Sequence, residues 1–215
     1  MSILVYNPNS SMTVTLAIAD SLKPLGEYFE VTLNVDGPAT IRTDEDAYLA
    51  GNMFLSRALT SDCDGFIIAC FSDPGLDQAR AKLTKPITGA QEASILEATE
   101  RAERYGIIAL SSKAVPRHQK NIAKMGLLDR LVAELPLPDV SAAASGQDVI
   151  WPEMLTNGRD LKRQGAGAIV LGCAGMGTLA ERLQAELSIP VIDPVQAAGK
   201  LALRRRNQQT NRRPV

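Results

Sequence analysis

Short apolar runs alternate with amphipathic stretches along most of the chain. The runs are rich in isoleucine and valine, and they predict strands near residues 2–6, 29–35, 65–70, 106–110, 129–134, 168–173 and 190–192. Between them, apolar residues recur at helical spacing, which predicts helices near 12–22, 44–60, 74–83, 91–104, 114–125, 151–164, 177–187 and 194–205. This alternation is typical of βαβ units around parallel sheets, so the pattern predicts an α/β fold.

Two of the strand-like runs end in a cysteine and share their surroundings. Residues 65–70 end at Cys70 and residues 167–173 end at Cys173, and each run leads into a helical stretch and then a short run containing proline. The apolar run at residues 3–7 and the one at residues 106–110 are about as far apart in the sequence as the two cysteines are. This shared offset indicates an internal repeat. We therefore expect two similar lobes, the first formed by residues 1–95 plus 190–215 and the second by residues 96–189.

Composition and charge exclude several classes of protein. The 215 residues can bury a substantial core, and a net charge of −1 gives no strong field for nucleic acid or an anionic membrane. The apolar runs are shorter than a membrane span, and no basic segment precedes an apolar one at the start, so we expect a cytoplasmic protein. Three cysteines without Cys-x-x-Cys spacing favour reduced thiols over a disulfide scaffold. The arginines from 204 onwards predict a frayed, solvated tail.

The strand ends offer chemistry for proton transfer. Ligands of open parallel sheets bind beyond the carboxyl ends of the strands, where Cys70 and Cys173 lie. A helix N-terminus lowers the pKa of a thiol, so near neutral pH we expect one cysteine to be a thiolate and the other a thiol. Such a pair could remove a proton from one face of an activated carbon and deliver one to the other face.

An enolate-like intermediate needs hydrogen-bond donors. The backbone and side-chain groups that could supply them, or otherwise contact a substrate, are those of Asn7, Ser10, Phe71, Ser72, Ser111, Ser112, Ala174 and Gly175. The single histidine, His118, lies in a polar helical start and is predicted to be solvated. No cluster of ligands at metal spacing is present, so we expect no metal.

Other features receive structural interpretations. Cys63 precedes a strand and is expected to be a bystander, and Asp73 with Pro74 fits the start of a helix. The loop at 135–147 could be a lid or slack, and its small residues favour slack. The glycines of residues 172–177 do not match G-x-G-x-x-G, and no G-x-S-x-G elbow is present, which disfavours a nucleotide enzyme or a serine hydrolase.

Four segments resemble the Asp/Glu/hydantoin racemase superfamily, most closely its hydantoin and allantoin racemase branch. They are Asn7-Pro8-Asn9-Ser10, residues 69–76 around Cys70, residues 170–176 around Cys173, and Pro190-Val191-Ile192-Asp193. The resemblance implies a cofactor-independent racemase with two pseudo-symmetric lobes, the active site between them, and Cys70 and Cys173 as the acid and base. A related decarboxylase branch keeps only the late cysteine, so the presence of both favours racemisation.

Departures from the family pattern concern the substrate more than the reaction. Ser72 stands where many members have an acidic residue, Gln91 lies beside the typical Glu-Ala pair, and Ser112-Lys113-Ala114 replaces a common Arg-Ser pair. The four loops at the predicted strand ends, residues 7–11, 70–73, 110–112 and 173–176, offer no cation apart from the adjoining Lys113. We therefore expect a neutral ring, either a 5-substituted hydantoin or allantoin. The alternatives are an aspartate or glutamate racemase, a maleate isomerase, and a non-enzymatic small-molecule-binding protein. The resemblance also implies a homo-oligomer.

Overall fold

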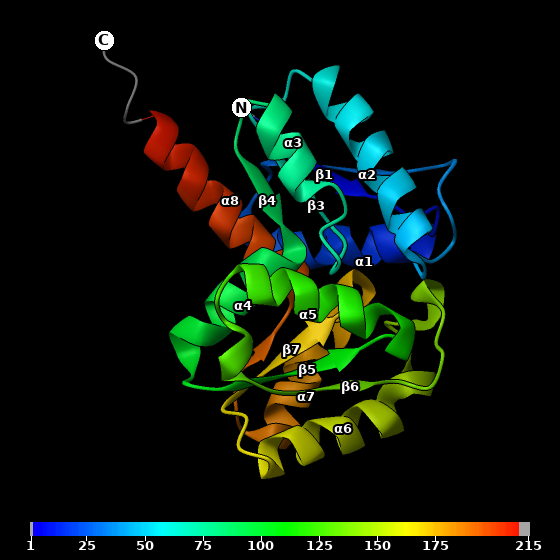
Figure 1. The fold of residues 1–215 in the computed structure, drawn as a ribbon, viewed down its shortest axis with the longest axis vertical. Coiled ribbons are helices and arrows are strands. Elements are labelled where there is room, and N and C mark those ends of the chain that lie inside the picture. Colours follow the sequence, from blue (N-terminus) through cyan, green and yellow to red (C-terminus); the bar gives the residue numbers. More distant parts are fainter. Residues whose placement is uncertain (1, 211–215) are drawn as a thin grey trace.

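The computed structural model describes residues 2–210, which form two α/β lobes, one above the other in Figure 1. The first sheet has the strand order β2-β1-β3-β4, with β1 at Ile3–Asn7, β2 at Phe29–Leu33, β3 at Gly65–Ile68 and β4 at Ile87–Gly89. The second has the order β6-β5-β7-β8, with β5 at Tyr105–Ala109, β6 at Leu131–Pro136, β7 at Ala168–Gly172 and β8 at Val191–Ile192. Paired strands are parallel in both sheets, and the matching orders confirm the predicted fold of two similar lobes.

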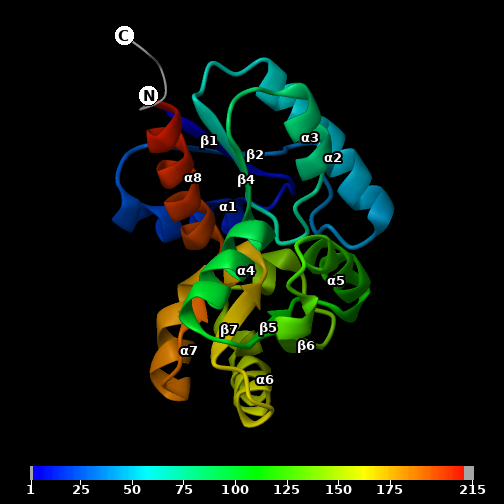
Figure 2. The ribbon, with the colours of Figure 1, turned by 60° about the vertical axis from the view of Figure 1, so that its left-hand side comes forward.

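Eight α-helices surround the two sheets. They are α1 Met12–Leu22, α2 Asp44–Leu59, α3 Leu76–Lys82, α4 Ala90–Arg101, α5 Val115–Lys124, α6 Trp151–Arg163, α7 Ala180–Leu187 and α8 Pro194–Thr210 in the described part of the chain. In Figure 2, α2 and α3 lie on one side of the first sheet and α8 lies on the other. The helix ends follow local chemistry: α2, for example, begins at a capping box in which Thr43 and Asp46 satisfy each other's backbone N–H groups.

Strand β1 shows how the two faces of a sheet are divided. Leu4 and Tyr6 pack against Phe54 of α2 in one apolar cluster. Ile3 and Val5 point to the opposite face, because side chains alternate along a strand, and join a larger cluster. That cluster continues through α8 into the second lobe, so one core serves both lobes.

The last strand lies in a different sheet from the one we expected. Val191–Ile192 pairs with β7 in the second sheet, whereas the sequence placed residues 190–215 in the first lobe. Helix α8 then returns to pack on α1 and α4 and against β3 and β4. Strand β8 and helix α8 therefore bind the two lobes together. No helix within residues 2–210 is long and apolar enough to cross a bilayer.

Three local predictions need correction. Strand β4, Ile87–Gly89, was not predicted as a strand, because it contains a single large apolar residue and ends in glycine. Asp73 does not cap the helix that follows it; its carboxylate accepts the N–H groups of Gln91 at 2.9 Å and Glu92 at 2.8 Å and so caps α4, while Gly75, with φ of 77°, precedes α3.

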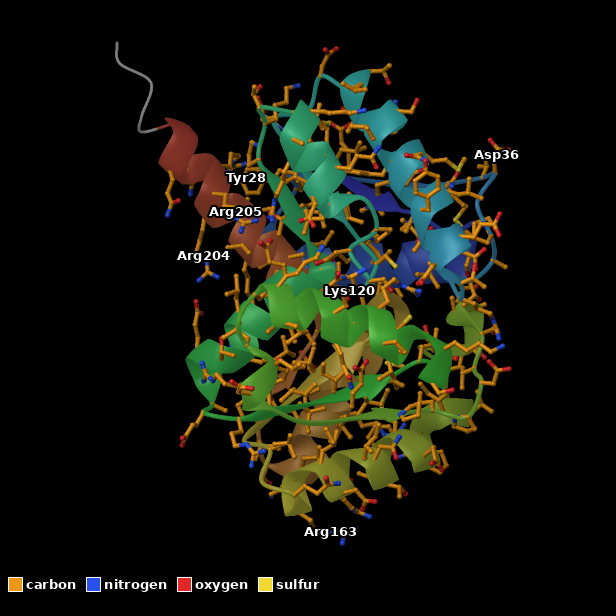
Figure 3. All side chains as sticks on the ribbon, in the orientation of Figure 1. Tyr28, Asp36, Lys120, Arg163, Arg204 and Arg205 are labelled. Atoms are coloured by element: carbon orange, nitrogen blue, oxygen red, sulfur yellow. The ribbon has the colours of Figure 1, made fainter. Side chains whose placement is uncertain are left out.

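The arginines from 204 onwards are not all a solvated tail. Arg204 and Arg205 lie in α8 (Figure 3), and Arg205 donates to Ile87 O, to Thr88 Oγ1 and to Glu92 Oε2. The predicted tail residues 212–214 lie outside the described residues.

Candidate active site

The carboxyl ends of β3 and β7 bring the two cysteines to one small cavity. Cys70 follows β3 by two residues and is partly exposed, and Cys173 follows β7 directly and is 9% exposed. Both line a cavity of about 50 Å³ between the lobes. The two sulfurs therefore come from corresponding ends of the third and seventh strands, one from each lobe.

The protonation expected from helix N-termini is not what the structure favours. Burial raises the pKa of Cys70 to about 12, although the N–H of Ser72 opposes the rise. Burial also raises the pKa of Cys173, against hydrogen bonds from the Ser145 hydroxyl and the Gly175 N–H. Desolvation of a thiolate outweighs these donors and favours the protonated form of both thiols near neutral pH. The expected lowering of a thiol pKa by a helix N-terminus was therefore wrong for both cysteines.

Half of the predicted substrate-binding residues line the cavity. They are Phe71, Ser72, Ser111 and Ala174. The other four lie outside the lining. The amide of Asn7 is buried and bonded to Asn9 and Thr15, the backbone N–H of Ser10 bonds Pro38 O, Ser112 begins a 3₁₀ turn, and the N–H of Gly175 is used by Cys173.

Several lining residues were missed by sequence reasoning. Thr40, Ile41 and Arg42, from the loop before α2, form part of the cavity wall. Nothing in that loop's composition marks it, since only the meeting of the lobes brings it to the cysteines.

The loop at 135–147 is not slack. Ala142 lines the cavity and its N–H bonds Thr40 Oγ1 at 3.1 Å, so this loop of the second lobe contacts the first lobe. Ser145 is fully buried, and its hydroxyl lies 2.6 Å from Ala142 O and within hydrogen-bond reach of Cys173, so its one hydrogen serves either the carbonyl or the sulfur. The loop therefore covers the late cysteine.

A buried chain of hydrogen bonds runs from the cavity into the second lobe. The Ser72 hydroxyl lies 3.2 Å from Nε2 of His118, and Nδ1 of His118 lies 2.6 Å from Oε1 of Glu134. The prediction of a solvated His118 was wrong: its side chain is 2% exposed. The available signal was its position four residues before Ile122, which places both on the buried face of α5.

A larger groove adjoins the cavity and shares Arg42 and Ser72 with it. Its volume is about 1130 Å³, and its cations include Arg117 and Lys120 of α5; Figure 3 shows Lys120 near the junction of the lobes. Arg117 Nη1 bonds Asp44 Oδ1 at 2.8 Å across the lobes. The sequence placed only Lys113 near the site, so the structure adds positive charge that was not expected.

Among residues 2–210, no group of three His, Cys, Asp or Glu side chains is arranged to bind a metal ion. Groups that can transfer protons, the two thiols among them, line the cavity.

The chain has two similar α/β lobes that each contribute a cysteine to one cavity, and its relatives place it among the isomerases of the racemase class. The chain belongs to the Asp/Glu/Hydantoin racemase family, which it matches over residues 3–202. It is 32% identical to the hydantoin racemase of Paenarthrobacter aurescens over 212 residues, covering 94% of this chain and 89% of that protein.

Solved structures give the same class. An allantoin racemase from Klebsiella pneumoniae superposes with a TM-score of 0.87 at 30% identity, covering 95% of this chain and 86% of that chain. A glutamate racemase from Bacillus anthracis, at 13% identity and a TM-score of 0.72, covers 96% of this chain and 82% of that chain and shares the fold.

Proposed function

We propose that the chain racemises a 5-substituted hydantoin or allantoin by proton transfer between Cys70 and Cys173. The observation that carries the proposal is the meeting of the two thiols, from corresponding strand ends of the two lobes, in one cavity. The hydantoin racemase and allantoin racemase relatives support the substrate class.

In this mechanism one sulfur acts as base and the other as acid. The thiolate takes the proton from the ring carbon between the carbonyl and the nitrogen, and the electron pair of the broken C–H bond moves onto the carbonyl oxygen. The opposite thiol then protonates the carbon on its other face, which leaves the configuration inverted and the protonation states of the two sulfurs exchanged. The reverse reaction starts from that exchanged state.

An aspartate or glutamate racemase is the second candidate. Such a substrate needs a cation for its carboxylate, and Arg42 lines the cavity. Arg42 already pairs with Asp139 at 2.6 Å, however, and this pairing leaves less of its charge for a substrate. We therefore place the neutral ring first.

Deuterium exchange in D₂O separates these possibilities. Enantiopure 5-benzylhydantoin, allantoin, aspartate and glutamate would each be followed by NMR and optical rotation with wild type, Cys70→Ser and Cys173→Ser. We expect wild type to incorporate deuterium and lose optical activity on a hydantoin or allantoin, and each variant to lose racemisation by about 10³-fold. Cys63→Ser is the matched control, since Cys63 is buried in the other apolar cluster of the first lobe and contacts Ser2 instead of the cavity.

Each other outcome has a defined meaning. Exchange on aspartate or glutamate alone would replace the substrate class. Full racemisation by either variant would exclude the two-thiol mechanism. Binding without exchange on any substrate would favour the non-enzymatic alternative.

A further inference from the structure

The hydrogen-bonded chain of Ser72, His118 and Glu134 connects the two lobes at the cavity. Ser72 comes from the loop after β3, whereas His118 lies on α5 and Glu134 on β6. Asn121, also on α5, donates to Ser72 O at 3.0 Å, and the Ser72 N–H bonds Cys70. Both backbone polar groups of Ser72 are thus occupied, and its hydroxyl is held by His118.

The burial of His118 and Glu134 restricts the net charge that this hydrogen-bonded pair can carry. The side chain of Glu134 is 0% exposed and that of His118 is 2% exposed. In the described part of the chain, no Lys or Arg forms an ion pair with Glu134, and its Oε2 has no hydrogen-bond partner. An isolated buried carboxylate is strongly unfavourable. A carboxylate that accepts Nδ1–H of a neutral imidazole would leave one net charge in this buried site, so burial favours a pair that is neutral overall, either as carboxylate with imidazolium or as carboxylic acid with neutral imidazole.

Both neutral arrangements have the same effect on Ser72. In the first, both ring nitrogens of His118 carry hydrogen; in the second, Glu134 donates to Nδ1 and the ring hydrogen lies on Nε2. Nε2–H then donates to Ser72 Oγ in either case. Because Nε2 cannot accept a hydrogen bond in either case, the hydrogen of the Ser72 hydroxyl has to point away from His118. Ser72 lines the cavity, so this hydrogen is available to a substrate bound there.

We propose that Glu134 and His118 are positioning residues that fix the Ser72 hydroxyl as a hydrogen-bond donor to the substrate. The acceptor is the carbonyl oxygen next to the reacting carbon, on which negative charge develops when the thiolate removes the proton. No proton is transferred from Ser72 in this step. The inference deepens the proposed racemase function and rests on it for the identity of the acceptor.

The protonation of Nε2 can be measured without any substrate. His118 is the single histidine of the chain, so protein labelled with ¹⁵N-histidine gives one pair of ring signals. We expect an Nε2 shift typical of a protonated nitrogen in the wild-type protein near neutral pH. The shift of a bare, accepting Nε2 would overturn the proposal, because Ser72 would then donate to His118 instead of to the substrate.

Kinetics test what the hydroxyl does. We expect Ser72→Ala to lower kcat by about 10²-fold with little change in KM, because the donor acts on charge that develops in the transition state. Ser72→Thr keeps the hydroxyl and should recover most of kcat. Ser94→Ala is the matched control, since Ser94 is also buried but its hydroxyl bonds Ala90 O and Gln91 O within its own helix.

The variant His118→Phe tests whether His118 positions the Ser72 hydroxyl. His118→Phe keeps a ring against Phe71, whose centroid lies 4.9 Å from that of His118, but removes the donor. It should lower kcat to a similar degree as Ser72→Ala, and combining the two should add little. A rise in KM at unchanged kcat for Ser72→Ala would overturn the assigned role. If wild type racemised none of the substrates, the proposed function would fail, and the NMR measurement would still decide the state of His118.

Discussion

Cys70 and Cys173 are each supported by short-range donors, yet burial dominates their acidity. The Ser72 N–H acts on one sulfur, and the Gly175 N–H and Ser145 hydroxyl act on the other. The sulfurs also influence each other, since Cys173 raises the pKa of Cys70 further once burial has acted. Two interacting thiols ionise in two steps that belong to the pair. The single-thiolate state that the proposed mechanism needs is therefore a minor one at neutral pH.

This acidity predicts an alkaline pH profile. Because burial raises the pKa of both thiols, that of Cys70 to about 12, the fraction of enzyme with one thiolate grows with pH through the neutral range. We expect log kcat/KM for deuterium exchange, corrected for the enzyme-free rate, to rise by about one unit per pH unit from pH 7, and to fall again only after the second thiol ionises.

The Ser145 hydroxyl supplies the comparison for that profile. Ser145→Ala removes a donor that lowers the pKa of Cys173, so the rising limb should move to higher pH. Ser56→Ala, on the exposed face of α2, should leave it in place. A maximum of kcat/KM at or below pH 7 in wild type would contradict the acidity that the structure indicates.

At the scale of elements, Arg205 ties α8 to the start of α4. It donates to the carbonyl of Ile87 and to the carboxylate of Glu92, and its side chain is 28% exposed. Burial pushes the pKa of Glu92 up, but hydrogen bonds from Arg80 and Arg205 outweigh it and leave that pKa lowered. The contacts of Arg205 therefore hold a charged group where two elements meet.

Neighbouring arginines give a matched test of this junction. Arg205→Gln should lower the free energy of unfolding by about 1–2 kcal/mol, because it removes charge-assisted hydrogen bonds that are only partly screened. Arg204→Gln should change it by less than about 0.5 kcal/mol, since Arg204 reaches Glu100 only at 3.8 Å and both side chains are more than half exposed. Urea unfolding of both variants measures the difference. Equal effects would show that Arg205 is part of a solvated tail after all.

The spacing of apolar residues predicted the helices and strands well, but it did not predict which residues tertiary packing brings to the site. Every α-helix and seven of the eight strands in residues 2–210 were expected, because most of their apolar patterns are long enough to show a period. The positions of Cys70 and Cys173 followed from strand ends in the same way. Residues 40–42 reach the cavity only through the meeting of the two lobes, and Glu134 reaches His118 only through the packing of α5 against β6, so local sequence carries little signal for them.

Physical reasoning about one element can also mislead when tertiary burial outweighs it. The dipole of a helix N-terminus favours a thiolate, but the seven-residue α3 starts six residues after Cys70, too far for its first turn to act. A 3₁₀ turn follows Cys173 in place of an α-helix. Desolvation then decides the pKa of both groups.

At the scale of the whole molecule, the two lobes share one apolar core. The larger cluster contains Ile3 and Ile67 of the first sheet together with Ile107 and Val170 of the second. Val195 of α8, which is fully buried, belongs to the same cluster. Since β8 lies in the second sheet and α8 packs on the first, the end of the chain has to be folded for either lobe to keep its core.

This shared core predicts that the lobes unfold together. The single tryptophan, Trp151 on α6, reports the second lobe by its fluorescence, and the thiol of Cys63, 6% exposed in the first lobe, reports the first by its reactivity. Measured in a Cys70→Ser, Cys173→Ser background, the two probes should give one urea midpoint. Val195→Ala should remove about 2 kcal/mol and move both curves by the same amount, because the side chain that it shortens supports both lobes. Exposure of Cys63 at a lower urea concentration than the Trp151 transition would show that the first lobe unfolds alone and that α8 does not couple the two.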